Sequence, residues 1–506
     1  MKNIALGAIA ASVFCAQASV IGITADFRGE TPPNRAMRDI KFPCDLSNAA
    51  GVEFDMKVED RTEFSMFSYH LDCDGVWVSV NADTISGGEW NRIALKRPKD
   101  RKDWSKTRGI RVSGWRGGTN CTSIAIRNIS VSPVVPEHEL SKQEKADRQR
   151  GIDATNRLAL ARLAAIPAPD GERRMVWAHR PTAMRDRTWD QALRIIKRGG
   201  YTDLIANLAL GPVAAYKSDV LLTTAKYDGR DCLEECLSAC RRHGVKLHVW
   251  ICCWRTGWGI SGEDVARFES EGRFQRSNAG VKKDWLCPSH PANRKMLVDS
   301  MLELAKKGVD GVHFDYIRYP DCSYCFCDGC KMRFEERIGR KLSGWPKVLQ
   351  RDRALDRAWR EFRRDTITAP VAEVSGRIHR EHPGVEVSAA VFISPTADWD
   401  LMGQDWGTWC EKGYLDFVCP MTYADSLESF SGRLRKLRTE VTPNVPMYPG
   451  IGLGVWKRDG LDAKKFSDQV CHLRENGGKG FSVFDLSWRL ERLVNTVSDF
   501  GRRNGK

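Results

Sequence analysis

The 506-residue sequence predicts an α/β fold, a (β/α)8 TIM barrel preceded by a small all-β sandwich domain. From Met175 onward, short apolar runs alternate with amphipathic helical stretches, and eight such runs match the strand number of a closed parallel barrel. Upstream, residues 19–135 hold short alternating runs separated by Gly, Asn, Asp and Pro, which is typical of a sandwich. The chain is also too long for one ordinary domain.

The first 18 residues predict a signal peptide. Lys2 supplies the positive charge, residues 4–16 are apolar, and Ala16-Gln17-Ala18 forms a cleavage site. We therefore expect a secreted or periplasmic protein. No later apolar run approaches the roughly 20 residues that a membrane-spanning helix needs.

The predicted sandwich occupies residues 19–135. Its segment 88–95 (GEWNRIAL), Trp104 and the strand 124–129 (IAIRNI) resemble β-sandwich domains of the carbohydrate-binding-module type. That resemblance implies either a glycan-binding sandwich or a purely stabilising one, because a fold does not fix a function.

A charged, helical linker is expected over residues 136–172, where Pro167, Pro169 and Gly171 close it. The catalytic barrel would then occupy residues 173–506. Its longest connection, from about 320 to 384, follows the fourth strand. The eight predicted strands are Met175–Ala178, Leu204–Leu208, Lys246–Cys252, Gly311–Tyr316, Val385–Ile393, Leu415–Met421, Val445–Ile451 and Gly480–Phe484.

The net charge of +14 suits an acidic glycan or an anionic cell wall as the partner, or else reflects a basic, solvated surface. No nucleic-acid-binding motif accompanies this charge, so we do not expect nucleic acid as a partner.

Asp315 is the first candidate for catalysis. It ends the fourth predicted strand, and the active sites of such barrels lie at the carboxyl ends of the strands. An acid within an apolar strand is costly unless it faces a polar site. His313 shares its face by the two-residue period, so both side chains are expected in the barrel interior or at its mouth. The alternative is a buried Asp315 satisfied by Arg318 or by backbone amides.

Several segments between about residues 175 and 490 resemble motifs of the family 10-like glycosyl hydrolases, and they occur in the same order as in that family. This resemblance implies a barrel that hydrolyses glycosidic bonds in polysaccharides. The matching segments are Trp177, 243–250 (HGVKLHVW), 286–291 (LCPSHP), 309–320 (VDGVHFDYIRYP) and 413–423 (GYLDFVCPMTY).

One departure concerns the fourth strand, where many relatives carry two adjacent acids and this chain has Tyr316 after Asp315. Glycoside hydrolysis ordinarily needs two carboxyl groups, one to protonate the leaving oxygen and one to attack the sugar or activate water. We assign Asp315 as one catalytic residue and Asp425, after the sixth strand, as the other. Three further acids near strand ends are alternatives, each also explicable as a cap or loop residue: Asp398, Asp400 and Asp485.

Aromatic and polar side chains near the strand ends are expected to bind substrate, the aromatics by stacking on sugar faces and the others by bonding hydroxyls. For each, the alternative is a packed or capping residue. They are His179, Asn207, His248, Trp250, His313, Tyr316, Arg318, Tyr423, Asp485 and Trp488.

Four cysteines lie close together after the fourth strand: Cys322, Cys325, Cys327 and Cys330. Four thiolates suit a tetrahedral zinc ion, and two disulfides are the alternative in an exported protein. The stretch 325–330 (CFCDGC) resembles the structural zinc loop of family 42 β-galactosidases. There the fourth cysteine comes from elsewhere, which leaves Cys322 open as a ligand. Four thiolates leave no free coordination position, so zinc here would be structural, and no cofactor is expected for catalysis.

The sequence thus predicts a secreted glycoside hydrolase that cleaves O-glycosidic bonds in a polysaccharide or cell-wall glycan with a carboxylate pair at the barrel mouth. The alternative is a non-catalytic glycan-binding protein that has kept the barrel.

Overall fold

The computed structural model describes residues 20–504, except 29–32, 48, 81–86, 98–102, 134–141, 228, 258, 442–444 and 454–462. The predicted signal peptide lies outside the described residues. The chain forms two compact units, residues 1–149 and 150–506. Within the described part, no helix combines the length and the apolar character needed to cross a membrane.

The first unit contains two antiparallel four-stranded sheets whose apolar side chains share one core. Alternation along each strand points Val52, Phe54 and Met56 into this core and leaves the intervening residues facing outward. The first sheet has the order β1 (Ile21–Asp26), β8 (Cys121–Pro133), β3 (Ala49–Val58), β6 (Trp90–Lys96). The second has the order β2 (Arg35–Cys44), β7 (Thr107–Arg116), β4 (Phe64–Cys73), β5 (Val76–Val80).

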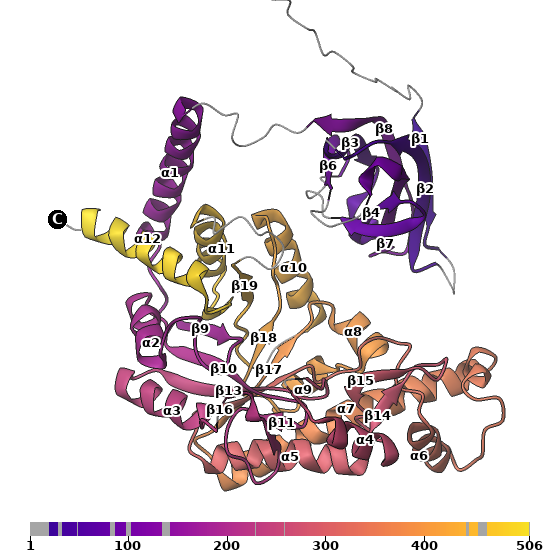
Figure 1. Ribbon diagram of the computed structural model, residues 1–506, viewed down its shortest axis with the longest axis vertical. Helices are drawn as coiled ribbons and strands as arrows, with labels where there is room; N and C mark the ends of the chain where they lie inside the picture. Colours follow the sequence, from indigo (N-terminus) through magenta and orange to yellow (C-terminus); the bar gives the residue numbers. More distant parts are fainter. Residues whose placement is uncertain are drawn as a thin grey trace, which may run out of the picture. The chain divides into compact units, whose positions relative to one another are not determined.

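The second unit confirms the predicted barrel, in which eight strands follow one another in parallel around a ring (Figure 1). In chain order they are β9 (Arg173–Ala178), β10 (Asp203–Leu210), β13 (Lys246–Cys252), β16 (Gly311–Asp315), β17 (Glu386–Val391), β18 (Phe417–Pro420), β19 (Gly450–Gly452) and β20 (Gly480–Phe484). β20 pairs with β9. Between β18 and β19 the ring closes through Val418, whose N–H donates to Pro446 O and whose carbonyl accepts from Tyr448 N–H.

Helices lie outside the ring (Figure 1) and cover the outer faces of the strands, so every residue of β10 is buried. Local signals start and stop these helices: Thr188 and Gln191 form a capping box before α2, and Gly244 ends α3 with a φ of 58°. The principal helices are α2 (Trp189–Arg198), α3 (Cys232–His243), α5 (Pro291–Lys306), α7 (Arg353–Glu381), α8 (Pro395–Met402), α9 (Trp406–Glu411), α10 (Leu427–Glu440), α11 (Ala463–Glu475) and α12 (Trp488–Asn504).

Shorter helices and strands lie within the loops that follow the carboxyl ends of the barrel strands. A hairpin of β14 (Phe274–Arg276) and β15 (Lys282–Leu286) lies between β13 and α5, preceded by α4 (Gly262–Ser270). α6 (Asp328–Ile338) lies in the long connection after β16. The two-residue strands β11 (Val213–Ala214) and β12 (Leu222–Thr223) extend the sheet beside β10.

The helix that precedes the barrel, α1 (Lys142–Ala165), is tied to the barrel by its C-terminal half. Arg162 bonds Glu475 at 2.7 Å, and Leu160 is buried. Arg474 of α11 donates to Ile166 O at 2.9 Å and also pairs with Glu172, just ahead of β9.

Candidate active site

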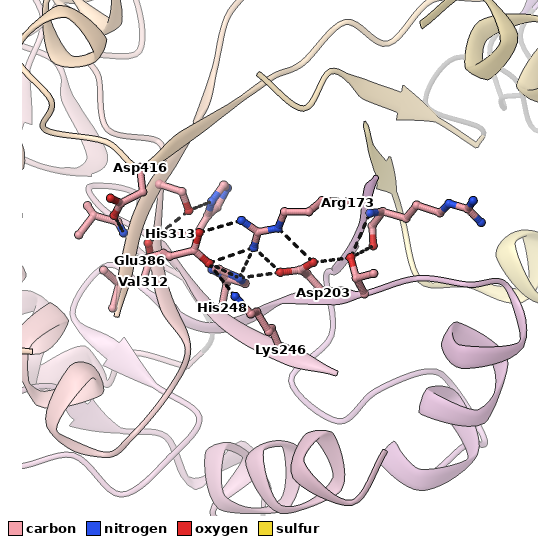
Figure 2. A network of polar contacts seen from close by, with 12 residues as sticks. Arg173, Asp203, Lys246, His248, Val312, His313, Glu386 and Asp416 are labelled. Carbon is pink, nitrogen blue, oxygen red and sulfur yellow. Dashed lines mark hydrogen bonds and ion pairs between the residues drawn. The ribbon is translucent and has the colours of Figure 1, made fainter. Parts of the chain in front are cut away.

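The amino ends of the strands hold a charged cluster that closes the bottom of the barrel (Figure 2). Arg173 lies between Asp203 and Glu386, with 2.7 Å to a Glu386 oxygen, and also bonds Asp203. His248 Nε2 lies 3.1 Å from Asp203 Oδ1, and both side chains are buried. Although burial acts to raise it, hydrogen bonds from His248 and Arg173 hold the pKa of Asp203 well below its usual range.

This arrangement corrects the prediction that His248 binds substrate. Its side chain points inward as its strand position requires, but it lies near the amino end of β13, opposite the mouth. Asp203, His248 and Glu386 could in principle hold a metal ion, but the Arg173 guanidinium already supplies the positive charge between them.

His313 is also misassigned as a substrate-binding residue. It lies in the filled barrel interior, wholly buried, with Nδ1 2.9 Å from Ser388 Oγ and its ring edge-on to Trp177. Burial lowers the pKa of His313 to about 3, so the ring is neutral and packs as a core residue.

Asp315 lies at the carboxyl end of β16, where the mouth begins, and is 7% exposed. Burial raises the pKa of its carboxyl to about 6, against the opposing effects of the Tyr316 N–H, which donates to Oδ1 at 2.7 Å, and of the nearby Arg318. A carboxyl group that stays protonated close to neutral pH is suited to act as a general acid.

Tyr316 follows with a φ of 51°, in the left-handed region that a bulky residue rarely adopts. The turn points the residue away from the strand and toward Trp285, whose ring centroid lies 5.5 Å away. Strain of this kind is commonly retained where a side chain must be held in one place at a site.

An aromatic wall surrounds the mouth beside Asp315. His179, directly after β9, packs edge-on to Trp250 with 5.6 Å between centroids, and both pack against Phe484 at the end of β20. Tyr423, after β18, packs on the other side of Phe484 at 5.5 Å. The buried indole nitrogen of Trp250 meets no acceptor in hydrogen-bonding geometry, although it is close enough to Asp315 to lower the pKa of that carboxyl.

Three more of the predicted substrate-binding residues lie close to these aromatic residues in space or in sequence. Asn207 ends the inward-facing part of β10, donates to Cys252 Sγ at 3.4 Å, and has its buried oxygen without a donor. Arg318 follows β16 and stacks on Tyr316. Trp488, at the start of α12, is 53% exposed.

Asp485 and Asp315 share Tyr423 as a neighbour. Both act on the Tyr423 hydroxyl, whose pKa is raised well above its usual value by burial and then by these two acids. Burial also raises the pKa of Asp485, against the effects of Ser487 and His179. Asp485 directly follows the last residue of β20, whereas Asp425 lies five residues beyond Pro420, the last residue of β18.

Asp398, in the first turn of α8, lies on the other side of Arg318. Burial raises its pKa to about 7, even though it accepts a hydrogen bond from Ser394 N–H at 2.8 Å. Asp400 instead pairs with Arg360 of α7. Asp315, Asp398 and Asp485 thus have raised pKa values, and of these three carboxyl groups Asp315 alone belongs to a barrel strand, as its last residue.

The cysteine cluster differs from the predicted set by one member. Cys325, Cys327 and Cys330 are joined by Cys287 from the end of the β14–β15 hairpin, and the four buried sulfurs lie within 4.8 Å of one another. Cys322 is exposed and outside this group. Spacing along the chain could not reveal Cys287, which lies 38 residues before Cys325.

The sulfur geometry fits a tetrahedral metal site. Cys287 Sγ lies 3.4 Å from Cys330 Sγ and 3.7 Å from Cys327 Sγ. A tetrahedral zinc ion at about 2.3 Å from each sulfur requires separations of about 3.8 Å, whereas a disulfide requires about 2.05 Å. Such an ion would join the β14–β15 hairpin to the loop after β16, on which Arg318 stands, and would leave no open position for chemistry.

The barrel is similar in sequence to known proteins. The family model described as glycosyl hydrolase-like 10 matches residues 209–459, which confirms the family resemblance of the sequence. An S-layer-related protein from Niallia circulans is 26% identical over 311 residues, which cover 51% of this chain and 19% of that protein.

Solved structures resemble this chain at low sequence identity. A β-galactosidase from Bacillus circulans sp. alkalophilus is 15% identical with a TM-score of 0.46, over 65% of this chain and 55% of that one. The catalytic domain of a β-amylase from Paenibacillus polymyxa is 11% identical with a TM-score of 0.46, over 67% and 98%. This chain thus spans about half of the β-galactosidase.

Proposed function

We propose that this chain, whose barrel carries a glycosyl hydrolase-like 10 domain, is an exported glycoside hydrolase that cleaves O-glycosidic bonds in a polysaccharide or cell-wall glycan. The observation that carries the proposal is the buried Asp315 carboxyl, whose pKa of about 6 keeps a proton available at the carboxyl end of a barrel strand. The exposed His179 and the half-buried Tyr423 offer ring faces and edges to a sugar, whereas Trp250 is 3% exposed and packs against His179.

As the partner carboxylate we propose Asp485 in place of Asp425. Asp315 and Asp485 both act on Tyr423 from the ends of β16 and β20, so a glycosidic bond held over Tyr423 would have a carboxyl group from each strand beside it. In this mechanism Asp315 protonates the leaving oxygen, while Asp485 attacks the sugar or activates water.

The decisive test is reducing-sugar release from neutral, acidic and cell-wall glycans by the wild type and by Asp315→Asn, Asp485→Asn and Asp425→Asn. We expect the first two substitutions to lower kcat by at least about 100-fold, the usual scale for a positioned acid or base. Asp425→Asn, the matched control, should stay within about threefold. If Asp425→Asn were as damaging as Asp485→Asn, the assignment of the second carboxylate would be wrong.

Non-catalytic glycan binding is the second candidate, and it is favoured by Tyr316, which stands where many relatives have a second acid. Under this alternative, the wild type and Asp315→Asn would both bind glycan in affinity electrophoresis, and neither would release reducing ends.

Three accompanying properties are proposals as well. The signal pattern of residues 1–18 supports export, and the S-layer in the name of the Niallia circulans relative fits it. The four clustered thiols suit a structural zinc ion. Glycan binding by the sandwich is supported by the half-buried Trp77 and Trp115, which lie on the outward-facing side of the second sheet.

A further inference from the structure

Two arginines flank Tyr316 at the mouth. Arg318, two residues beyond it, has its guanidinium carbon 4.9 Å from the Tyr316 ring centroid. Arg255, in the loop after β13, has its guanidinium carbon 5.8 Å from the same centroid. The two charges come from neighbouring barrel strands and lie beside the residue that follows Asp315.

Neither guanidinium forms an ion pair with another residue that the structure describes. Among the residues that the structure describes, neither Arg255 nor Arg318 has a carboxylate within ion-pair distance, in contrast to Arg173 at the opposite end of the barrel. Arg318 donates one N–H to Tyr319 O at 3.3 Å, and its buried Nε has no acceptor. A buried, charged donor without a partner is costly.

The surroundings of Arg318 also fix its direction. Its guanidinium carbon lies 4.6 Å from the ring centroid of Phe392 and 5.4 Å from that of Trp285, in addition to its contact with Tyr316. Aromatic rings on several sides stabilise the cation and hold its plane, so the planar edge carrying its N–H groups is what remains for a ligand.

The nearest acids do not compensate this charge when the site is ready to act. Asp315 must be protonated to donate a proton, and Asp398 is also neutral over part of the same range, because burial raises its pKa to about 7. With both acids neutral, two positive charges remain at the mouth. An arginine fork matches a carboxylate in shape and charge.

We propose that Arg255 and Arg318 form a carboxylate-binding subsite beside Asp315, and that the glycan substrate carries a uronic acid or another carboxylated sugar next to the cleaved bond. That the bound glycan is a substrate rests on the proposed function, while the carboxylate-binding site itself rests on the arginine geometry. Arg255 is exposed, so it is the member that a substitution can remove without a cost to the fold.

The test compares polygalacturonate, glucuronoxylan and peptide-free peptidoglycan strands with the carboxyl-reduced form of each polymer. Binding is measured by affinity electrophoresis with the full chain carrying Asp315→Asn, and reducing-sugar release is measured with the chain carrying Asp315. We expect at least one carboxylated polymer to bind about tenfold more tightly than its reduced form, the scale of a charge-assisted hydrogen bond.

Added to either background, Arg255→Gln should remove most of that difference by weakening only the carboxylated form, and Arg255→Lys should retain part of it. Arg194→Gln, on the exposed face of α2, is the matched control and should change neither form. Thermal melting curves confirm that each variant is folded.

The outcomes separate the two proposals. Equal cleavage of a polymer and its reduced form would overturn the carboxylate subsite and leave the hydrolase intact. Preferential binding of carboxylated polymers without any cleavage would support the subsite and refute the hydrolase. Loss of binding to both forms in Arg255→Gln, or no preference for any carboxylated polymer, would also overturn the subsite.

Discussion

The charged cluster at the bottom of the barrel predicts a large and specific loss of stability on Arg173→Met. The substitution keeps most of the side-chain volume but removes the cation. It leaves Asp203, which is 1% exposed, beside a half-buried Glu386, with His248 and the exposed Lys246, 3.6 Å from Glu386, as the remaining partners. Breaking a buried ion pair by deleting one partner typically costs about 3–5 kcal/mol of unfolding free energy.

The size of the barrel unit converts this cost into a temperature. Residues 150–506 unfold with an entropy of roughly 0.75 kcal/mol/K, at about 2.1 cal/mol/K per residue. A loss of about 3–5 kcal/mol therefore lowers Tm by about 4–7 °C, provided that the unit unfolds in one transition. Differential scanning calorimetry at pH 7 measures this shift directly.

The pH dependence supplies an independent check. Because the pKa of Asp203 is lowered in the folded state, the stabilisation is present at pH values above its ordinary pKa of about 3.9 and is lost as the pH falls through and below that value. The gap in Tm between the wild type and Arg173→Met should therefore narrow below about pH 4.

The matched control is Arg242→Met, which removes an exposed arginine 2.7 Å from Asp190 on the barrel surface. Exposed pairs contribute little, so its Tm should change by about 1 °C or less. If Arg173→Met lowered Tm no more than Arg242→Met, the charged cluster would not contribute to the stability of the barrel as proposed.

Three further predictions concern the mouth and its loops. Because burial raises the pKa of Asp315 to about 6, its ionisation destabilises the fold as the pH rises from about 4 to 6; Asp315→Asn should raise Tm at pH 7 but hardly at pH 4, and an equal gain at both would contradict the shift. For the wild type, kcat/KM should fall as the pH rises above about 6, and a flat profile through pH 8 would exclude Asp315 as the acid. Elemental analysis should find about one zinc per chain, nearly lost in Cys287→Ser and retained in Cys322→Ser; equal loss in both would refute the proposed ligand set.

The barrel could be predicted because its strands are short, buried on both faces and separated by amphipathic helices. Lys246–Cys252 and Gly480–Phe484 have the predicted bounds, since each is a continuous apolar run that ends at a turn. The seventh strand was harder: only Gly450–Gly452 pairs as a strand, and residues before it reach β18 through isolated hydrogen bonds.

The sequence could predict which side chains face the barrel interior, but not how far along the barrel axis each one lies. A two-residue period gives the face of a strand on which His248 and His313 lie, but the height of each residue in a tilted barrel depends on the stagger between strands, which one sequence does not encode. Cys287 was missed for a related reason, because loops bring distant residues together by tertiary packing. The position of Asp315 at the carboxyl end of β16 could be predicted, because the residue lies near the end of an apolar run.

The way α1 joins the barrel has a practical consequence for dissecting this protein. The stretch before the first strand looks like a dispensable spacer, yet Arg162 and Ile166 are bound to α11, and Leu160 is buried. A truncated barrel that starts at Arg173 would lose these contacts, whereas one that starts near Arg150 would keep them. The natural point of separation between the two modules therefore lies inside a continuous helix, so any transplantation of this barrel onto another binding domain should carry the second half of that helix with it.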